Sequence, residues 1–215
     1  MVIGVSNLKG GVGKTTIAQN LAVCLAHLDY KVCIIDTDTN QNSMAWYEAR
    51  AEDLPEIMVV SVTDKGLSKS VKTFSATHDF IIIDGTPSLA DIATRIILAS
   101  DILLIPMLPS AHDFRTLKLF FERYEQALEF RDSIPAYFIL NQYNDRIKLD
   151  RQIKELLKEQ DAELLETTLK KRVVYKNAAV DGMGAYEYDD PKAKAEMFDL
   201  TKEVLSLVAQ VAAAE

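Results

Sequence analysis

The chain has 215 residues with 24 basic and 32 acidic side chains, a formal net charge of −8. This length fits one domain, and the acidic balance argues against a surface that coats nucleic acid uniformly, although it leaves room for a local basic patch. No apolar run approaches the ~20 residues of a membrane-spanning helix, and no leader pattern precedes the first apolar segment, so we expect a cytoplasmic protein. Cys24 and Cys33 sit among apolar residues and are expected to be buried thiols.

Short, β-branched apolar runs alternate with helical patterns along the chain. We predict strands over residues 2–5, 31–35, 57–62, 80–83, 102–105 and 136–140. We predict helices over residues 15–28, 43–52, 67–77, 89–99, 114–130, 150–159 and 192–213. Nearly continuous apolar strands are typical of parallel sheets buried on both faces. The alternation therefore predicts a single α/β domain over residues 1–215, a doubly wound, mostly parallel sheet with helices on both faces.

A glycine-rich stretch, Lys-Gly-Gly-Val-Gly-Lys-Thr-Thr at residues 9–16, follows the first predicted strand and opens the first helix. Its glycines allow the backbone to turn sharply and to aim N–H groups inward, where the helix N-terminus also favours phosphate. Lys14 is expected at the β- and γ-phosphates, and the Thr15 hydroxyl at Mg²⁺. The pattern predicts an ATPase with ATP and Mg²⁺ as ligands. The residues expected at the nucleotide are Gly10, Gly11, Val12, Gly13, Lys14, Thr15 and Thr16.

Three aspartates follow predicted strands, at the strand ends where open α/β sheets bind ligands. Asp84 ends the run Phe-Ile-Ile-Ile-Asp and is expected to hold Mg²⁺ through water. Asp36 and Asp38 end the second strand. For these two, the alternative is that they cap the helix predicted to begin at Ser43.

The motif KGGVGKTT, with its additional Lys9, resembles the deviant Walker A motif of the ParA/MinD ATPases, and the resemblance runs from Val2 to about residue 208. It implies that Lys9 crosses a nucleotide-sandwich homodimer to the partner's phosphates. It also implies that Asp38 orients the attacking water and that Asp36 belongs to the Mg²⁺ shell. Asn141 matches the adenine-recognition position, with a turn-forming asparagine as the alternative.

Two segments depart from the family pattern or add to it. Thr39 and Asn40 stand where the family usually has Pro and Gln. Residues 105–110 resemble a Pro-x-x-Pro segment of the family, which implies a loop that faces the dimer partner.

The segment 184–195 is similar to the tail of the partition ATPases, and no helix-turn-helix precedes the phosphate loop, so the chain resembles a small ParA of the ParF type. This resemblance implies segregation of plasmids or chromosomes, nonspecific DNA binding by the ATP dimer, association with the nucleoid, and stimulation by a centromere-binding, ParB- or ParG-like partner. The basic residues expected to contact DNA are Lys170, Lys171, Arg172, Lys176, Lys192 and Lys194. A solvated basic face is the alternative.

Other functions of the same ATPase type stay open. They are positioning of protein cargo, handling of conjugative DNA, and MinD-like membrane cycling. Residues 203–215 contain no lysine or arginine, so we expect no membrane partner. A metabolic P-loop enzyme is a further alternative, but two cysteines placed in predicted elements argue against an iron–sulfur cluster shared across a dimer.

Overall fold

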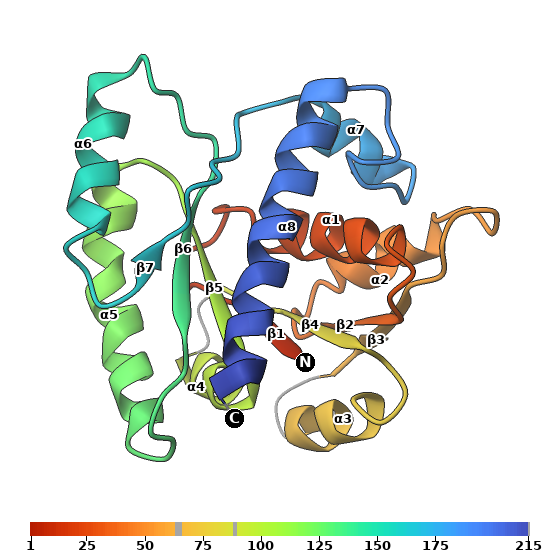
Figure 1. The fold of residues 1–215 in the computed structure, drawn as a ribbon, viewed down its shortest axis with the longest axis horizontal. Helices are drawn as coiled ribbons and strands as arrows, with labels where there is room; N and C mark the ends of the chain where they lie inside the picture. The colour runs from red at the N-terminus through yellow and green to blue at the C-terminus, as the bar shows by residue number, and fades with distance from the viewer. Residues whose placement is uncertain (63–65, 88–89, 215) are drawn as a thin grey trace.

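The computed structural model describes residues 1–62, 66–87 and 90–214 and consists of a parallel sheet between layers of helices (Figure 1). Its seven strands follow the order β3-β2-β4-β1-β5-β6-β7, and every pair is parallel. The strands are β1 (Val2–Val5), β2 (Val32–Asp36), β3 (Met58–Ser61), β4 (Phe80–Asp84), β5 (Ile102–Met107), β6 (Ala136–Leu140) and β7 (Glu163–Leu164).

Helices cover both faces of this sheet. They are α1 (Lys14–Ala26), α2 (Asn42–Glu48), α3 (Leu67–Phe74), α4 (Ala90–Ala99), α5 (Ala111–Leu128), α6 (Lys148–Leu157), α7 (Val174–Val180) and α8 (Pro191–Ala214). Side chains of α1, α2, α7 and α8 join one core cluster, whereas those of α3, α4 and α5 pack on the other face. The predicted doubly wound α/β fold is therefore confirmed.

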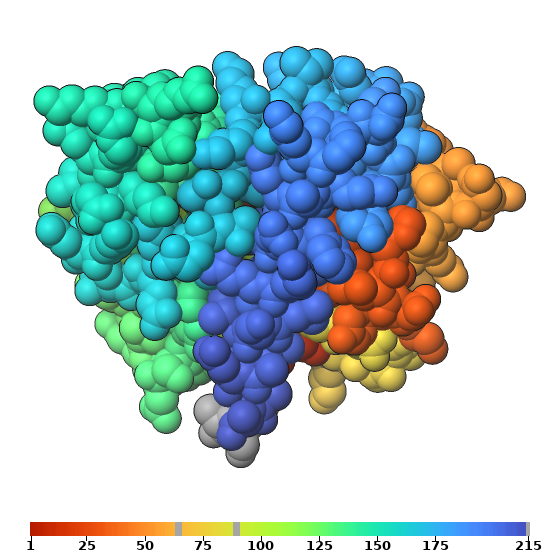
Figure 2. Space-filling model, turned by 45° about the horizontal axis from the view of Figure 1, so that its top comes forward, coloured from red at the N-terminus to blue at the C-terminus, as the bar shows by residue number. Residues whose placement is uncertain are grey.

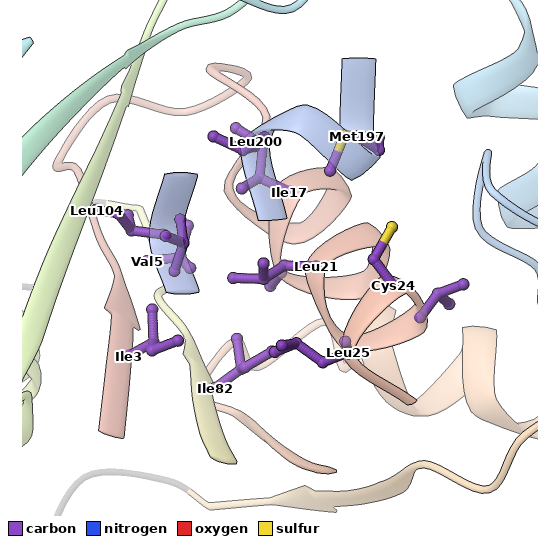
Figure 3. Packing of buried hydrophobic residues seen from close by; sticks show 14 of the residues in the cluster. Ile3, Val5, Ile17, Leu21, Cys24, Leu25, Ile82, Leu104, Met197 and Leu200 are labelled. Carbon is purple, nitrogen blue, oxygen red and sulfur yellow. The ribbon is translucent and has the colours of Figure 1, made fainter. Parts of the chain in front are cut away.

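The largest core cluster lies between α1, α8 and the sheet (Figure 3). Ile17 and Leu21 of α1 are fully buried between β1, β4 and β5 on one side and Met197 and Leu200 of α8 on the other. Because α1 begins at the end of the glycine-rich loop, this packing also fixes the direction in which that loop opens.

Both cysteines are buried free thiols, as predicted, and burial raises the pKa of each. Within the described ranges, no helix combines the length and the apolar character that crossing a bilayer requires.

The prediction missed two elements, and two residues of one predicted loop, 106 and 107, belong to a strand. β7 has only two residues, too few for a periodic signal, and α7 is one short helix in a segment rich in basic residues. Residues 106 and 107 belong to β5 rather than to a loop. Pro106 is paired with Ile139 of β6, but its nitrogen faces the β1 side. The register between β1 and β5 ends at Val5↔Leu104, so no carbonyl group of β1 needs the missing N–H. Its carbonyl oxygen accepts a hydrogen bond from Asn7 Nδ2 at 2.8 Å.

Buried polar contacts join α2 and Arg50, the second residue after it, to the segment between α7 and α8. Trp46 Nε1 donates to the Met183 carbonyl at 3.0 Å. The Arg50 guanidinium donates to Glu187 at 2.6 and 2.9 Å and to the Gly182 carbonyl at 3.0 Å. The side chains of Arg50 and Glu187 are only 4% and 2% exposed. Burial by itself would raise the pKa of Glu187, but the hydrogen bonds from Arg50 and the Gly184 N–H outweigh it and lower that pKa.

Gly182 is required at this contact. Its φ of +65° lies in the left-handed region, and a Cβ atom there would lie 2.3 Å from the backbone nitrogen of Arg50. Only glycine combines this backbone conformation with so close an approach to the end of α2.

We expect Arg50→Met to lower the free energy of unfolding by about 3–5 kcal/mol, because the substitution leaves the Glu187 carboxylate buried without its cation. Urea unfolding at neutral pH measures this change. Arg50→Met combined with Glu187→Gln should recover part of the loss, because no bare charge remains. Lys202→Ala, which removes an exposed pair with Asp199, is the control and should cost less than ~1 kcal/mol. Equal losses in the two single variants would contradict the prediction.

Candidate functional site

The register of the central strands brings the predicted site residues to one edge of the sheet. Asp36 of β2 pairs with Asp84 of β4, and Asp84 pairs with Val5 of β1. The glycine-rich loop leaves β1 just beyond Val5. Two carboxylates and the loop therefore lie side by side at the carboxyl ends of parallel strands, the position at which such sheets bind ligands.

The glycine-rich loop has the tight backbone that its sequence predicts. Gly11 and Gly13 have φ angles of +78° and +99°. A Cβ atom on Gly13 would lie 2.2 Å from Asn141 Nδ2, so the loop and the end of β6 approach each other as closely as glycine allows. The helix α1 starts immediately after Gly13, which directs its first N–H groups toward the inside of the loop.

Lys14 is a buried cation at the centre of this loop. Lys14 is only 5% exposed, and its Nζ donates a hydrogen bond to the Lys9 carbonyl at 2.9 Å. Burial lowers the pKa of Lys14 to about 8, although the charges of Asp84 and Asp38 oppose the shift. An anion in the loop would offset the cost of burying this ammonium group, so its surroundings fit a phosphate ligand.

Asp84 is the buried anion opposite Lys14. It is 1% exposed and accepts hydrogen bonds from Thr15 Oγ1 at 3.1 Å and from Ser43 Oγ at 2.8 Å. Burial, followed by the charge of Asp36, raises the pKa of Asp84 to about 7. A hard divalent cation would stabilise this carboxylate, and the neighbouring Thr15 hydroxyl is a suitable second oxygen ligand. The residues present therefore fit the predicted magnesium ion.

Both carboxylate oxygens of Asp36 accept hydrogen bonds from backbone N–H groups. It accepts from the Ser43 N–H at 2.8 Å, from Met44 at 3.3 Å and from Asp38 at 3.0 Å. This arrangement matches the alternative in which Asp36 caps the start of α2. Burial raises its pKa despite these hydrogen bonds. A place for Asp36 in a magnesium shell stays a prediction.

Asp38 is buried and lines a cavity of about 850 Å³ beside the loop. Its Oδ1 accepts from the backbone and the side chain of Asn40, at 2.9 and 3.0 Å. Among the described residues, none donates a hydrogen bond to the other carboxylate oxygen, so it is available to a water or ligand.

Ser43 is a site residue that the sequence did not single out. It is fully buried in the first turn of α2, donates to Asp84, and accepts a hydrogen bond from Gln19 at 3.4 Å. In the sequence, Ser43 stands soon after the Asp-x-Asp pair, and the pattern there predicts only that a helix begins.

A cavity of about 850 Å³ opens over the loop. Asn141 lines it and donates to the Val12 carbonyl at 2.8 Å, which links the predicted adenine position to the phosphate loop. The opposite wall is formed by the predicted basic segment, through Lys170, Lys171, Arg172 and Lys176. The residues that the sequence did not assign to the cavity include Gln142, Val173 and Tyr175. Lys9 does not line it within this single chain.

The six predicted DNA-contacting residues have different surroundings. Arg172 is paired with Glu196 of α8, with its Nε 3.1 Å from the carboxylate, so its charge is largely neutralised. Lys192 and Lys194 lie in the first turn of α8 and are exposed; the Lys194 Nζ lies 4.6 Å from the centre of the Tyr186 ring. The Arg172–Glu196 pair thus joins the basic segment before α7 to α8.

Comparisons with known proteins agree with this geometry. Residues 3–185 match the family model described as the CobQ/CobB/MinD/ParA nucleotide binding domain. The Maintenance of carboxysome distribution protein A of Halothiobacillus neapolitanus is 29% identical over 189 residues, 86% of each chain. Protein ParA of Rhizobium radiobacter is 30% identical over 180 residues, 81% of this chain and 80% of that one. The septum site-determining protein MinD of Pyrococcus horikoshii, solved with Mg-ADP, shares the fold with a TM-score of 0.74, 20% identity and 98% coverage of both chains.

We expect binding of Mg-ADP to take up a proton at pH 9. Lys14 is mostly neutral there, since its pKa is about 8 without ligand, and a bound phosphate favours the ammonium form. Asp84 is already ionised at that pH and adds nothing. The contribution of Lys14 to affinity should be complete below pH 8 and should fall as the pH rises above it. Calorimetry in two buffers of different ionisation enthalpy measures the proton; equal heats in both buffers would contradict the expected uptake.

Proposed function

This chain belongs to the CobQ/CobB/MinD/ParA nucleotide-binding family, and on that premise we propose that it is a Mg²⁺-dependent ATPase that segregates DNA. The observation that carries the ATPase proposal is the presence of two buried opposite charges at one site. Lys14 lines a cavity of about 850 Å³, and Asp84 lies behind the lining residue Thr15, from which it accepts a hydrogen bond. Buried charges are costly unless a ligand or a partner offsets them. A triphosphate with a divalent cation supplies both of the missing partners.

The residues of the loop would hold ATP in the following way. Lys14 and the N–H groups at the start of α1 bind the phosphates, and Asn141 meets the adenine edge with its amide. Thr15 and Asp84 would hold Mg²⁺, which supplies charge neutralisation at the β- and γ-phosphates when bound. Asp38, which lines the cavity, orients the attacking water.

Lys9 completes the site in trans. It lies on the outer side of the loop, half-buried, and its carbonyl accepts the Lys14 ammonium, so the main chain is fixed while the Lys9 side chain is outside the cavity. In a homodimer with ATP between the subunits, this lysine reaches the partner's phosphates and stabilises the charge of the transferring phosphoryl group. Hydrolysis would then require dimerisation.

DNA segregation is the use of this ATPase that we propose first. Its support is the similarity to ParA over most of the chain and the presence of exposed lysines on α8 and beside α7. The ATP dimer binds DNA nonspecifically through these lysines, and a ParB- or ParG-like partner stimulates hydrolysis and release. Positioning of a protein cargo is the second candidate, favoured by the nearly equal similarity to a carboxysome distribution protein.

We expect Lys9→Ala to bind ATP but to lose most of its turnover, because the cation that crosses the dimer is missing. Asp38→Ala should instead hold ATP without hydrolysing it and accumulate as a dimer. Phosphate release and light scattering with Mg-ATP measure the two properties. Wild-type turnover in Lys9→Ala, or a monomeric Asp38→Ala protein with bound ATP, would contradict these roles. Failure of the wild-type protein to bind ATP would overturn the ATPase proposal itself.

We expect Lys192→Ala combined with Lys194→Ala to weaken binding of the ATP-bound protein to random-sequence duplex DNA and to reduce the slope of log K against log salt by about 0.9 per lost phosphate contact. Anisotropy titrations at two or more salt concentrations, with ADP as the nucleotide control, measure the slope. Lys69→Ala, on the distant α3, is the matched control. An unchanged slope in the double variant would remove these lysines from the DNA surface and favour a protein cargo.

A further inference from the structure

A groove of about 770 Å³ lies between α5 and α6, and it shares no lining residue with the nucleotide cavity. Figure 1 places α6 at the edge of the molecule opposite α2, and Figure 2 shows the same segment (teal) on the outer surface. The groove is therefore a separate surface that the ATPase site does not use.

Apolar side chains continue from the core into this groove. Ile153 of α6 is buried, whereas Leu149 and Leu156, four residues before it and three after it, are 45% and 41% exposed. The three lie on one face of the helix and line the groove together with Phe114 of α5. Large aliphatic side chains so exposed on one helix face mark a surface that another molecule covers.

The charged side chains beside these leucines are segregated by sign, with basic residues at one end of α6 and acidic residues at the other. Lys148 and Arg151 lie at the start of α6, and Glu155 and Glu159 lie at and beyond its end, all lining the groove. Among the described residues, Lys148 has no carboxylate at ion-pair distance, and Glu155 has only an exposed pair with Lys158. Such an exposed pair holds the glutamate weakly.

This order is self-complementary under a two-fold rotation. If two copies of α6 pack antiparallel with the axis near Ile153, Leu149 of each copy meets Leu156 of the other. Arg151 and Glu155 are each two residues from Ile153, and Lys148 and Glu159 are five and six residues from it. With the same axis, each basic residue of one copy therefore falls near a glutamate of the other copy. A two-fold interface requires that one patch complement itself in this manner.

We propose that the α5–α6 groove binds a second copy of this chain, α6 against α6, in an antiparallel dimer that forms without nucleotide. DNA is a poorer occupant because the floor of the groove is apolar and two glutamates stand among its three basic residues, Arg115, Lys148 and Arg151. The patch is small compared with the ~800 Å² per partner of a standard interface, so the dimer is weak and reversible. It leaves the nucleotide cavity open, and it does not depend on the proposed ATPase activity.

Sedimentation equilibrium of the full chain without nucleotide, from low to high micromolar concentration, tests the proposal. We expect a reversible monomer–dimer equilibrium that Leu149→Asp weakens at least about tenfold, equivalent to ~1.4 kcal/mol. Leu119→Asp is the matched control, because Leu119 is 57% exposed on α5 but does not line the groove. A monomer at every concentration, or equal losses in the two leucine variants, would overturn the proposal.

A second and more specific test exchanges the charges of Arg151 and Glu155. Arg151→Glu and Glu155→Arg should each weaken the dimer several-fold, and the double variant should restore it, because its two charges are merely exchanged across the axis. If the double variant loses as much dimer stability as the two single variants together, the antiparallel arrangement is overturned. Retained ATP binding shows that each variant is folded. A wild-type protein that dimerises but binds no ATP would remove the proposed function and leave this inference standing.

Discussion

The site depends on the burial of two opposite charges, Lys14 and Asp84, at the edge of a sheet whose strands bury mostly apolar side chains. The two groups do not form a direct ion pair. Burial lowers the pKa of Lys14 and raises that of Asp84, so it favours the neutral form of each. The surrounding network of Thr15, Ser43 and the Lys9 carbonyl holds both in position. Such an arrangement is unfavourable without a ligand and becomes favourable when an anion and a cation enter together. The proposed recognition of a metal–phosphate pair thus follows from the cost of burying these two charges by themselves.

The short helix α2 connects this site to the rest of the chain. Its first turn is fixed by Asp36 and, through Ser43, by Asp84; its far end is fixed by Trp46 and Arg50 to the segment before α8. A seven-residue helix is too short to be stable by itself, so these contacts determine its position. Changes at the strand edge and changes near α8 therefore act on the same small element.

Much of this arrangement could be predicted from the sequence, because it rests on local patterns. The apolar strands, the glycines at positions of positive φ and the aspartates at strand ends all carry short-range signals. What could not be predicted depends on contacts distant in sequence: the hydrogen bond from Ser43 to Asp84 and the pairing of Arg172 with Glu196. β5 is two residues longer than predicted because it stays paired with β6 up to Met107↔Leu140, and Pro106 is tolerated because β1 has already ended beside it. Elements as short as β7 and α7 have too few residues for a pattern to form.

The contact of Gly182 and Glu187 with Arg50 also limits how such proteins can be recombined. A chimera that took residues beyond α7 from one relative and the remainder from another would join a tail shaped for one α2 to a different α2. The two parts would be matched in fold but not in the hydrogen bonds buried between them. Exchangeable modules in this architecture therefore have to carry Trp46 and Arg50 together with the tail, although more than a hundred residues of sequence separate them.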